Sequence, residues 1–489
     1  PEGGRALWAG AGIWSMAACF YASFVITRNA AFIYHANGLL ATETVEPQAE
    51  AAIRKTTAYG YDGFGNRTTT TLCSLHIPDC ANASLPADTA PVWDDPTYVH
   101  RRSTVVYDSL GRFPVARHNS YGQVLEQVLA FDEYGHPTQV RYLSGETKSV
   151  FYDSLGRSYF ERSTTGAFSH SATYRCAGDC PNGAVARTEV RSGGAPKSTL
   201  YTDVLGRDVR RETVGFDGVE RWKVDTDYDA LGRIWHVSLP YGDGGIDGQT
   251  TTAYDTFGRV QSVTQANGRV DTPSTSGWTT THTISSDAGM QSRSETRNAL
   301  GELLSVTDNA GQSLSYAYDA QGTLSAVTLP GGRQLLITPD LLGRKRAQSD
   351  PDKGLVQFQY NAAGEVIRAE DAKHQLGLSW YDAEGRVRRR DDRAADGTPA
   401  ASARWSFDTG TATTQGAGQL QREEDPVSGY LKTYGYDGLG RAARSQTVWQ
   451  AWRRRAKVAG ELAIEPPVAS TKRSPSASTR SSVSASRRR

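Results

Sequence analysis

Apolar and polar residues alternate with a period of two along most of the chain. Leu314, Tyr316 and Tyr318 are separated by single small residues, and Val356 and Phe358 repeat the same spacing. Such alternation is typical of a strand with one buried face. Short turn sequences rich in Gly, Asp and Asn separate these runs, at 308–311 and 351–354 for example. The pattern predicts units of strand, turn, strand and turn, and therefore an all-β fold.

A short motif marks one of the two turns in each unit. It consists of an aromatic residue, Asp or Asn, two variable residues, Gly and often Arg, and thirteen copies keep the Asp/Asn-to-Gly spacing of three. The nine copies that begin with Tyr supply the candidate structural turn residues, which are Tyr61, Asp62, Gly65, Tyr107, Asp108, Gly111, Tyr152, Asp153, Gly156, Tyr228, Asp229, Gly232, Tyr254, Asp255, Gly258, Tyr318, Asp319, Gly322, Tyr360, Asn361, Gly364, Tyr381, Asp382, Gly385, Tyr436, Asp437 and Gly440.

The spacing of the copies predicts the architecture. The motif begins at 297, 318, 339, 360 and 381, which are 21 residues apart each time. A fixed period in this range indicates an array built by stacking one supersecondary unit. We therefore expect a repetitive antiparallel β-hairpin ribbon. Leu376, Leu378 and Trp380 are one residue out of phase with Tyr381, which predicts a bulge or a shifted register there.

Each motif residue has an expected local role. The Asp or Asn accepts hydrogen bonds from backbone amides two or three residues further on, and the Gly supplies a positive φ. We expect the Tyr ring to pack against its counterpart in the next repeat, and the Arg to lie across such a ring or to pair with a neighbouring Asp. Calcium ligation by the Asp series is the alternative, although calcium-binding β-rolls use a nine-residue repeat.

The repeats resemble the YD repeats of Rhs proteins, as in Tyr228-Asp229-Ala230-Leu231-Gly232-Arg233 and the turn 350–354. That family includes bacterial polymorphic toxins, shell components of insecticidal toxin complexes and animal teneurins. The resemblance covers about 59–446 and implies a β-ribbon that spirals into a hollow shell around a C-terminal effector. The Asp-containing segment at which the toxins cleave themselves is not recognisable here. Thirteen repeats also look too few for a whole cocoon, which suggests an interior slice of a shell or a degraded copy.

Three regions are expected: an N-terminal segment (1–58), a repeat region (59–446) and a basic, Ser-rich tail (447–489). Residues 6–27 carry no charge, which leaves a membrane or export segment, a buried helix and non-native sequence as open interpretations. From 452 onwards there are 10 Lys and Arg against 2 Asp and Glu, a local charge of +8. Because the whole chain is at +1, the rest carries −7, so we expect no nucleic-acid partner, and we expect the tail to be disordered.

The five cysteines suggest small covalent loops. Cys73 and Cys80 are close in sequence, as are Cys176 and Cys180, while Cys19 stands alone. Two candidate disulfides of short span fit an exported protein. A zinc site is the alternative, but no second close His/Cys pair follows either segment.

The sequence carries none of the usual catalytic signatures. It has no His-Glu-x-x-His, no Gly-x-Ser-x-Gly and no phosphate-binding loop, so we predict no enzyme activity and no cofactor or metal. The leading hypothesis is a non-catalytic shell segment of a secreted or surface-associated bacterial protein that encloses or presents a toxin or effector. The partners would be a C-terminal effector or toxin-complex subunits. The alternative is a surface adhesin that binds carbohydrate through exposed aromatics, and a shell predicts instead that Tyr316, Phe358 and Tyr360 are buried or line a cavity.

Overall fold

The computed structural model describes residues 28–50, 53–87, 90–178, 180–408, 416–438, 440–449 and 470–473. These residues form 35 strands and one short 3₁₀ helix, η1 (Pro91–Asp94). The uncharged N-terminal segment 6–27 and most of the basic tail lie outside the described residues. Within the described ranges, no helix has the length and apolar character that a bilayer crossing requires.

The strands have the following bounds: β1 (Ala30–Tyr34), β2 (Leu40–Val45), β3 (Lys55–Tyr61), β4 (Arg67–Cys73), β5 (His100–Tyr107), β6 (Pro114–His118), β7 (Val124–Phe131), β8 (Pro137–Tyr142), β9 (Thr147–Tyr152), β10 (Ser158–Ser163), β11 (Phe168–Arg175), β12 (Ala186–Ser192), β13 (Ser198–Thr202), β14 (Asp208–Val214), β15 (Arg221–Tyr228), β16 (Ile234–Ser238), β17 (Gln249–Tyr254), β18 (Val260–Thr264), β19 (Val270–Ser276), β20 (Thr279–Ser286), β21 (Gly289–Arg297), β22 (Leu303–Thr307), β23 (Ser313–Tyr318), β24 (Leu324–Thr328), β25 (Gln334–Pro339), β26 (Lys345–Asp350), β27 (Gly354–Tyr360), β28 (Val366–Glu370), β29 (Leu376–Tyr381), β30 (Val387–Arg393), β31 (Pro399–Phe407), β32 (Leu420–Asp425), β33 (Tyr430–Tyr436), β34 (Ala442–Trp449) and β35 (Ser470–Arg473).

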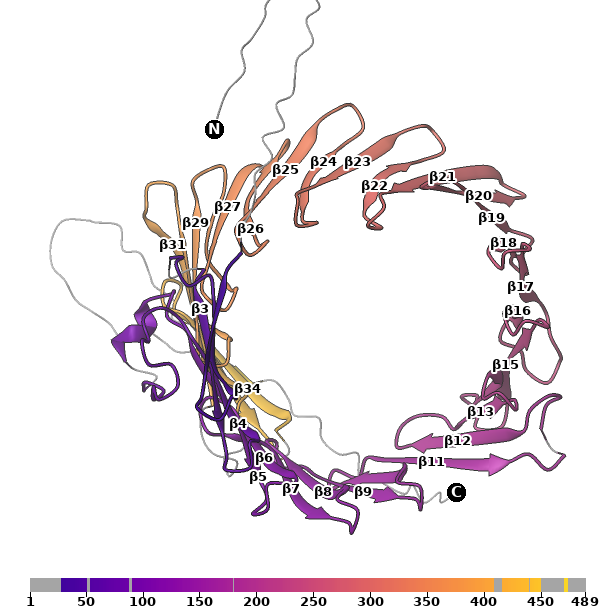
Figure 1. Ribbon diagram of the computed structural model, residues 1–489, viewed down its shortest axis with the longest axis horizontal. Coiled ribbons are helices and arrows are strands. Elements are labelled where there is room, and N and C mark those ends of the chain that lie inside the picture. Colours follow the sequence, from indigo (N-terminus) through magenta and orange to yellow (C-terminus); the bar gives the residue numbers. More distant parts are fainter. Residues whose placement is uncertain are drawn as a thin grey trace, which may run out of the picture.

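Every strand pairs antiparallel with the strand that follows it, so the described residues form one continuous ladder. The ladder bends into a ring around a central opening (Figure 1). The prediction of an all-β, antiparallel hairpin ribbon is confirmed. The sheet begins at Ala30, which lies before the repeat region expected from 59 onwards.

A β-bulge recurs at regular intervals along the curved ribbon. The register shifts by one residue at the aromatic position of the motif, as between Gly60 and Tyr61, between Ala253 and Tyr254, and between Trp380 and Tyr381. The last of these confirms the bulge predicted near Tyr381. A β-bulge bends its strand and increases the local twist. Because the bulge recurs beside the motif turns, it adds length along that edge of the ribbon and favours steady bending in one direction.

The ring closes on itself by overlap. Loop and turn residues near the N-terminal end of the ladder contact residues that follow them by 262 to 286 positions, as Tyr121 does with Ala383 and Asp94 with Trp380. The ribbon therefore completes one full turn of a spiral within this chain, and its two ends lie side by side at the left of Figure 1.

The buried residues are concentrated in this overlap. Trp93, Val99, Ile367, Trp380 and Ala383 are buried there. By contrast, the single-layered stretch 242–360, all of which the structure describes, contains no buried residue. The wall is thus one sheet thick over much of the ring, and backbone ladder hydrogen bonds rather than a packed core hold that part together.

Candidate functional site

The motif turn has one recurring geometry, which the copy at Asp229 illustrates. Oδ1 of Asp229 accepts hydrogen bonds of 2.9 Å from the amides of Leu231 and Arg233, and Oδ2 accepts one of 2.7 Å from Nε of Arg233. Gly232 has φ +81° and donates its amide to the Asp229 carbonyl at 2.9 Å. We expected the Asp to accept hydrogen bonds from amides two or three residues further on. It accepts them from the amides two and four residues further on.

These hydrogen bonds favour the ionised carboxylate. The Arg233 amide and then its guanidinium hold the pKa of Asp229 below the ordinary aspartate value, and the corresponding arginines do the same for Asp153 and Asp203. Hydrogen bonds to the charged form of a carboxyl lower its pKa in this way.

Successive motif turns are linked through Arg and Tyr. The guanidinium carbon of Arg233 lies 4.2 Å from the ring centre of Tyr254 in the next copy, and the hydroxyl of Tyr254 donates a 2.8 Å hydrogen bond to the carbonyl of Ile234. The expectation that each Tyr packs against its counterpart was wrong, since no ring contact in the described residues joins two successive motif tyrosines. The rings of Tyr228, Tyr254 and Tyr360 lie instead against the guanidinium of the preceding turn.

The same link recurs around the ring. The hydroxyls of motif tyrosines donate to the carbonyl that follows the preceding turn, in the pairs Tyr61 to Leu40, Tyr152 to Pro137, Tyr228 to Asp208, Tyr318 to Leu303, Tyr360 to Lys345, Tyr381 to Val366 and Tyr436 to Leu420. Because these turns all connect an odd-numbered strand to the next even-numbered one, they lie along a single margin of the ribbon, which we call the motif edge. The turns that connect even-numbered to odd-numbered strands form the opposite edge.

The predicted turn residues are therefore placed in a row rather than brought together in one pocket. All nine glycines of the Tyr copies have positive φ, between 65° at Gly111 and 89° at Gly364. Sequence reasoning missed one described copy, at 34–38, in which His35 stands where the other copies have Asp or Asn. Its signal was the four-residue spacing from Tyr34 to Gly38, which has φ +83°.

Two copies of the motif differ from the others in the charged residues of the turn. Where Asn replaces Asp, Glu replaces Arg: Asn361 donates to Glu365 at 2.8 Å, and Asn298 donates to Glu302 at 2.5 Å. The amide supplies the donor that Arg supplies elsewhere, and Glu supplies the acceptor. The turn keeps its internal hydrogen bond, but it gains a carboxylate on the motif edge that no arginine of the same turn neutralises.

The overlap of the two ends forms a seam between the opposite edge of residues 74–146 and the motif edge of residues 361–440. In the seam, the amide of Ser120 donates to Glu384 at 2.7 Å, and its hydroxyl donates to the Ala383 carbonyl at 3.0 Å. Arg101 forms a 2.5 Å ion pair with Glu365. Gln123 donates its buried side-chain amide to the Asp408 carbonyl at 3.0 Å. No periodicity of the sequence singled out these residues.

The structure contains two short covalent loops. Cys73 is bonded to Cys80 and Cys176 to Cys180, each with Cα atoms 5.8 Å apart. The first pair packs with Ala58 and Ile77 in a small apolar cluster, at the start of the loop that carries η1. Cys19 lies outside the described residues.

The two faces of the wall differ in chemistry. Trp380 marks the convex face because its indole donates a 2.9 Å hydrogen bond to Asp94 in η1, which lies outside the ring (Figure 1). Side chains alternate between faces along a strand. Gly377 and its paired neighbours Ala369 and Phe358 therefore lie on the concave face.

The register carries this assignment from β27 back to β22. It places eight apolar side chains on the concave face, which we call the concave stripe: Val306, Leu314, Tyr316, Val327, Leu335, Ile337, Val356 and Phe358. Strand β26 interrupts the stripe, because its residue at the paired position is Gln348. All eight side chains are half-buried. The convex face of the same strands carries Ser305, Thr307, Ser313, Ser315, Thr328 and Gln334, together with the exposed Leu336 and Leu355.

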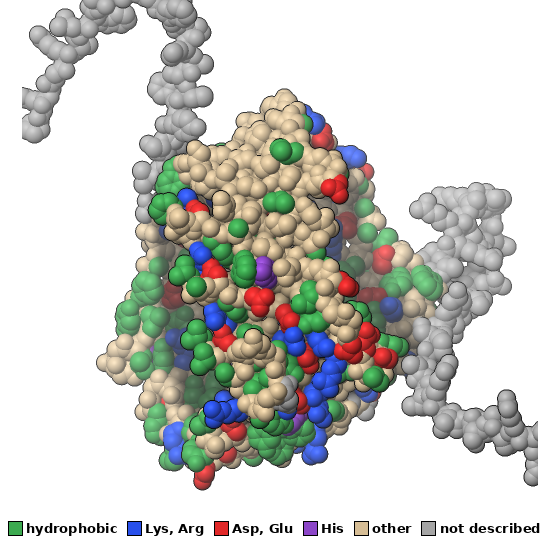
Figure 2. Space-filling model, turned by 90° about the vertical axis from the view of Figure 1, so that its right-hand side faces the viewer, with side chains coloured by type: hydrophobic (Ala, Val, Ile, Leu, Met, Phe, Trp, Pro, Cys, Tyr) green, Lys and Arg blue, Asp and Glu red, His purple; other side chains and the backbone are tan. Residues whose placement is uncertain are grey.

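Figure 2 views the outer surface of the right-hand part of the ring. Neutral polar side chains and backbone cover its upper part, and acidic and basic side chains are mixed below. Hydrophobic side chains lie among them on the lower part of this surface.

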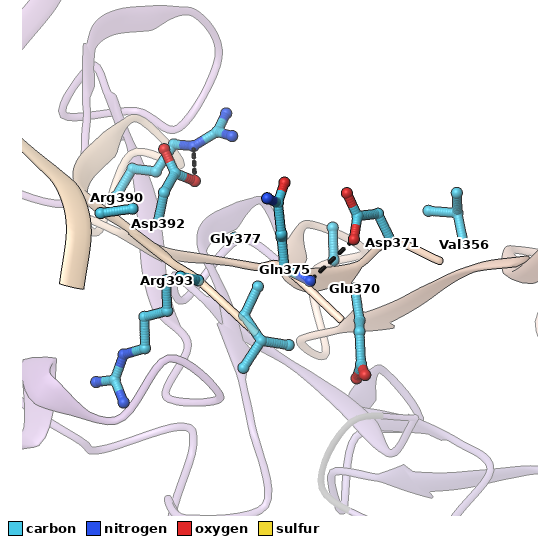
Figure 3. A pocket seen from close by; sticks show the side chains of 12 residues that line it. Val356, Glu370, Asp371, Gln375, Gly377, Arg390, Asp392 and Arg393 are labelled. Atoms are coloured by element: carbon cyan, nitrogen blue, oxygen red, sulfur yellow. Dashed lines mark hydrogen bonds and ion pairs between the residues drawn. The ribbon is translucent and has the colours of Figure 1, made fainter. Parts of the chain in front are cut away.

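A depression of about 440 Å³ lies beside the turns that join β28 to β29 and β30 to β31. Figure 3 shows Arg393 and Glu370 pointing to one side of the sheet, and Asp392 and Val356 to the other. Arg390 pairs with Asp392 at 3.0 Å, and both side chains are exposed. The depression therefore straddles the margin of the sheet and does not enclose a ligand. Elsewhere too, within the described ranges, no group of three or more His, Cys, Asp or Glu is placed to hold a metal ion.

Comparison with known proteins agrees with this geometry. Residues 297–334 match the model of the RHS repeat. No curated protein matches the chain. The crystal structure of TcdB2-TccC3-TEV is similar at 11% identity and a TM-score of 0.62, over 89% of this chain and 32% of that one. The Photorhabdus luminescens Tc holotoxin pore is similar at 13% identity and a TM-score of 0.32, over 84% of this chain and 24% of that one.

Fold and repeat together define a curved wall of β-hairpin repeats whose turns are linked along one edge. Residues 297–334 carry an RHS repeat, and the chain shares its fold with the TcdB2-TccC3-TEV structure. It spans about a third of the length of the TcdB2-TccC3-TEV chain that it resembles.

Proposed function

We propose that the chain is a non-catalytic wall segment of a shell that holds an unfolded polypeptide against its concave face. The observation that carries this proposal is the concave stripe, a row of apolar side chains that nothing in the described chain covers. Half-buried apolar side chains of this kind leave part of their apolar surface in water, which is costly, and a row of them can serve as a binding surface. Tyr316 and Phe358 belong to the stripe, which supports a shell. Tyr360, the third residue of that prediction, is half-buried against Arg344 of the preceding turn.

An unfolded polypeptide fits this surface better than a folded domain does. The stripe is a shallow row along a curved sheet, and an extended chain can follow such a row with its own apolar residues. A folded protein buries its apolar side chains and presents a largely polar surface.

The partners and location follow from the same proposal. The cargo would be a C-terminal effector, and the adjoining wall would come from toxin-complex subunits of the kind named in the TcdB2-TccC3-TEV structure. We propose the repeat region 59–446 as the wall, with 1–58 and 447–489 flanking it. Two disulfides favour an exported protein at the surface of, or secreted from, a bacterium.

The test uses reduced, carboxymethylated α-lactalbumin as a permanently unfolded probe and native α-lactalbumin as its control. Fluorescence anisotropy should show binding of the unfolded probe only. The variant Leu314→Ser/Val327→Ser should weaken that binding about tenfold or more, since each truncation removes an apolar contact worth on the order of 1 kcal/mol. The matched variant Ser315→Ala/Thr328→Ala changes the convex face of the same strands. Equal loss in both variants, or no binding of the unfolded probe, would contradict the proposal.

One observation favours carbohydrate binding as a second candidate. Phe151, Phe160 and Phe168 lie side by side on one face of β9–β11, with ring centres 5.5 and 6.5 Å apart, and His170 is 6.0 Å from Phe160. Phe151 and Phe168 are 42% exposed. An exposed aromatic row can stack on sugar rings. A glycan array probed with the chain and with its Phe168→Ala variant tests this, and equal signals from the two would exclude it.

A further inference from the structure

Only two motif copies carry Glu in the position of Arg, and the structure shows what one of them binds. Glu365 leans over Gly385 of the next copy, and Arg101 of the seam lies over the same glycine. A Cβ built on Gly385 would be 2.8 Å from Oε1 of Glu365 and 3.0 Å from Cζ of Arg101. The ion pair between the two side chains measures 2.5 Å. Asn361, Glu365 and Gly385 thus form a notch filled by an arginine from the opposite edge of another turn of ribbon.

The second copy has the same notch without the arginine. Glu302 is hydrogen-bonded to Asn298 and leans over Gly322, where a built Cβ would be 2.8 Å from Oε1 of Glu302. Apart from the chain neighbours of Gly322, no other atom lies within 4 Å of that point. Within the described part of the chain, no cation pairs with Glu302, whereas nearby Glu295 is paired with Arg293 and Arg297.

A neighbouring turn adds a separate sign of a missing cation. In most copies Oδ2 of the motif Asp accepts from the Arg four residues on, as Asp340 accepts from Arg344 at 2.7 Å. In the copy at Asp319 that residue is Thr323, and Oδ2 of Asp319 is buried without a hydrogen-bond partner. A buried carboxylate oxygen without a partner is costly. Two successive turns on the motif edge therefore carry a carboxylate, Glu302 in one and Asp319 in the other, that no arginine of the described residues binds.

We propose that Asn298, Glu302 and Gly322 form an arginine-docking site for the opposite edge of a neighbouring turn of YD ribbon, supplied by another chain of a longer shell. The site lies in the single-layered part of the wall, 63 residues before the filled notch, which is three periods of 21. This inference extends the proposed function, because it concerns how the wall grows. Its test involves the edge alone and says nothing of cargo on the concave face, so the two proposals fail separately.

The experiment titrates the full chain, labelled with ¹⁵N-glycine, with Nα-acetyl-arginine amide and separately with the lysine analogue. The Gly322 amide resonance should shift with the arginine probe and less with lysine, because a guanidinium can bind a carboxylate through two hydrogen bonds. Glu302→Gln should weaken this binding about tenfold, as loss of a charge-assisted hydrogen bond implies. Glu295→Gln is the matched control and should leave the titration unchanged.

The filled notch supplies an internal reference. The Gly385 resonance should not respond in the wild-type chain, because Arg101 already lies there, and should respond in Arg101→Ala. Equal shifts at Gly322 in wild type and Glu302→Gln would overturn the proposal. So would equal shifts at glycines whose turns carry their own arginine, such as Gly258, because these would show non-specific binding.

Discussion

The hydroxyl of Tyr254 donates a 2.8 Å hydrogen bond to the carbonyl of Ile234, one repeat earlier on the motif edge. The ring lies over the guanidinium of Arg233, which is itself bound to Asp229. Tyr254 is therefore tied to the turn before it, and the Asp229–Arg233 pair fixes the position of the cation. The repeat is a chain of such links, which stiffens a wall that has little core.

Removing the hydroxyl should weaken one link. Tyr254→Phe keeps the ring over Arg233 but loses the hydrogen bond, and we expect the free energy of unfolding to fall by about 0.5–1.5 kcal/mol. Chemical denaturation followed by circular dichroism measures this. Tyr316→Phe, on the concave stripe, is the control and should change stability less. A larger effect at Tyr316 would show that the motif hydroxyls do not link the turns.

A side chain at a motif glycine should strain the turn. Gly343 has φ +79°, and Gly343→Val should destabilise the fold by about 1–3 kcal/mol because a β-branched residue is strained there. The comparison is Gly435→Ala in β33, which lacks a positive φ and where a Cβ would meet only Cβ of Arg444, at 3.6 Å. Melting curves of the two variants should differ, and a Gly343→Val curve identical to wild type would refute the turn assignment.

Acid should destabilise the wall. In the folded chain the pKa values of Asp153, Asp203 and Asp229 are lowered, chiefly by the amide and then the guanidinium four residues on. The unfolded chain therefore takes up protons first as the pH falls below about 4. The free energy of unfolding should be highest above that pH and decline as the pH drops through the folded pKa values.

Urea unfolding at pH 7, 5, 4 and 3 measures this decline. A triple Asp→Asn variant at 153, 203 and 229 cannot titrate at these positions. Its stability should therefore depend less steeply on pH than that of the wild type, and parallel curves would assign the acid effect to other groups.

Cutting the seam should loosen the ring. Arg101→Ala leaves Glu365 partly buried without its cation, which we expect to cost about 1–3 kcal/mol. Spin labels on Ser144 and Gly438, at the two sides of the seam, should then show a broader distance distribution. Arg333→Ala removes an exposed pair with Asp352 and is the control, because exposed pairs contribute little. An unchanged distribution in Arg101→Ala would show that the other seam contacts suffice.

Local features of the sequence predict the repeat unit well. The alternation around Tyr316 and Phe358 indicates strands, and the 21-residue spacing indicates one repeated hairpin, because both depend on neighbours in the chain. The role of Tyr254 was harder to infer. Its partners, Arg233 and Ile234, lie about 20 residues earlier, and which of several nearby groups the ring contacts depends on the bulge that aims it.

The sequence by itself determined a ribbon of antiparallel hairpins with Asp-to-Gly turns, since backbone propensity and period are written into every copy. Only the tertiary structure decided that the ribbon closes after one turn, that Arg101 meets Glu365 across 264 residues, and which face carries the apolar row. The physical reason is that curvature accumulates. A small bend at each bulge is invisible in any one repeat, yet its sum over the whole ladder fixes which distant edges touch.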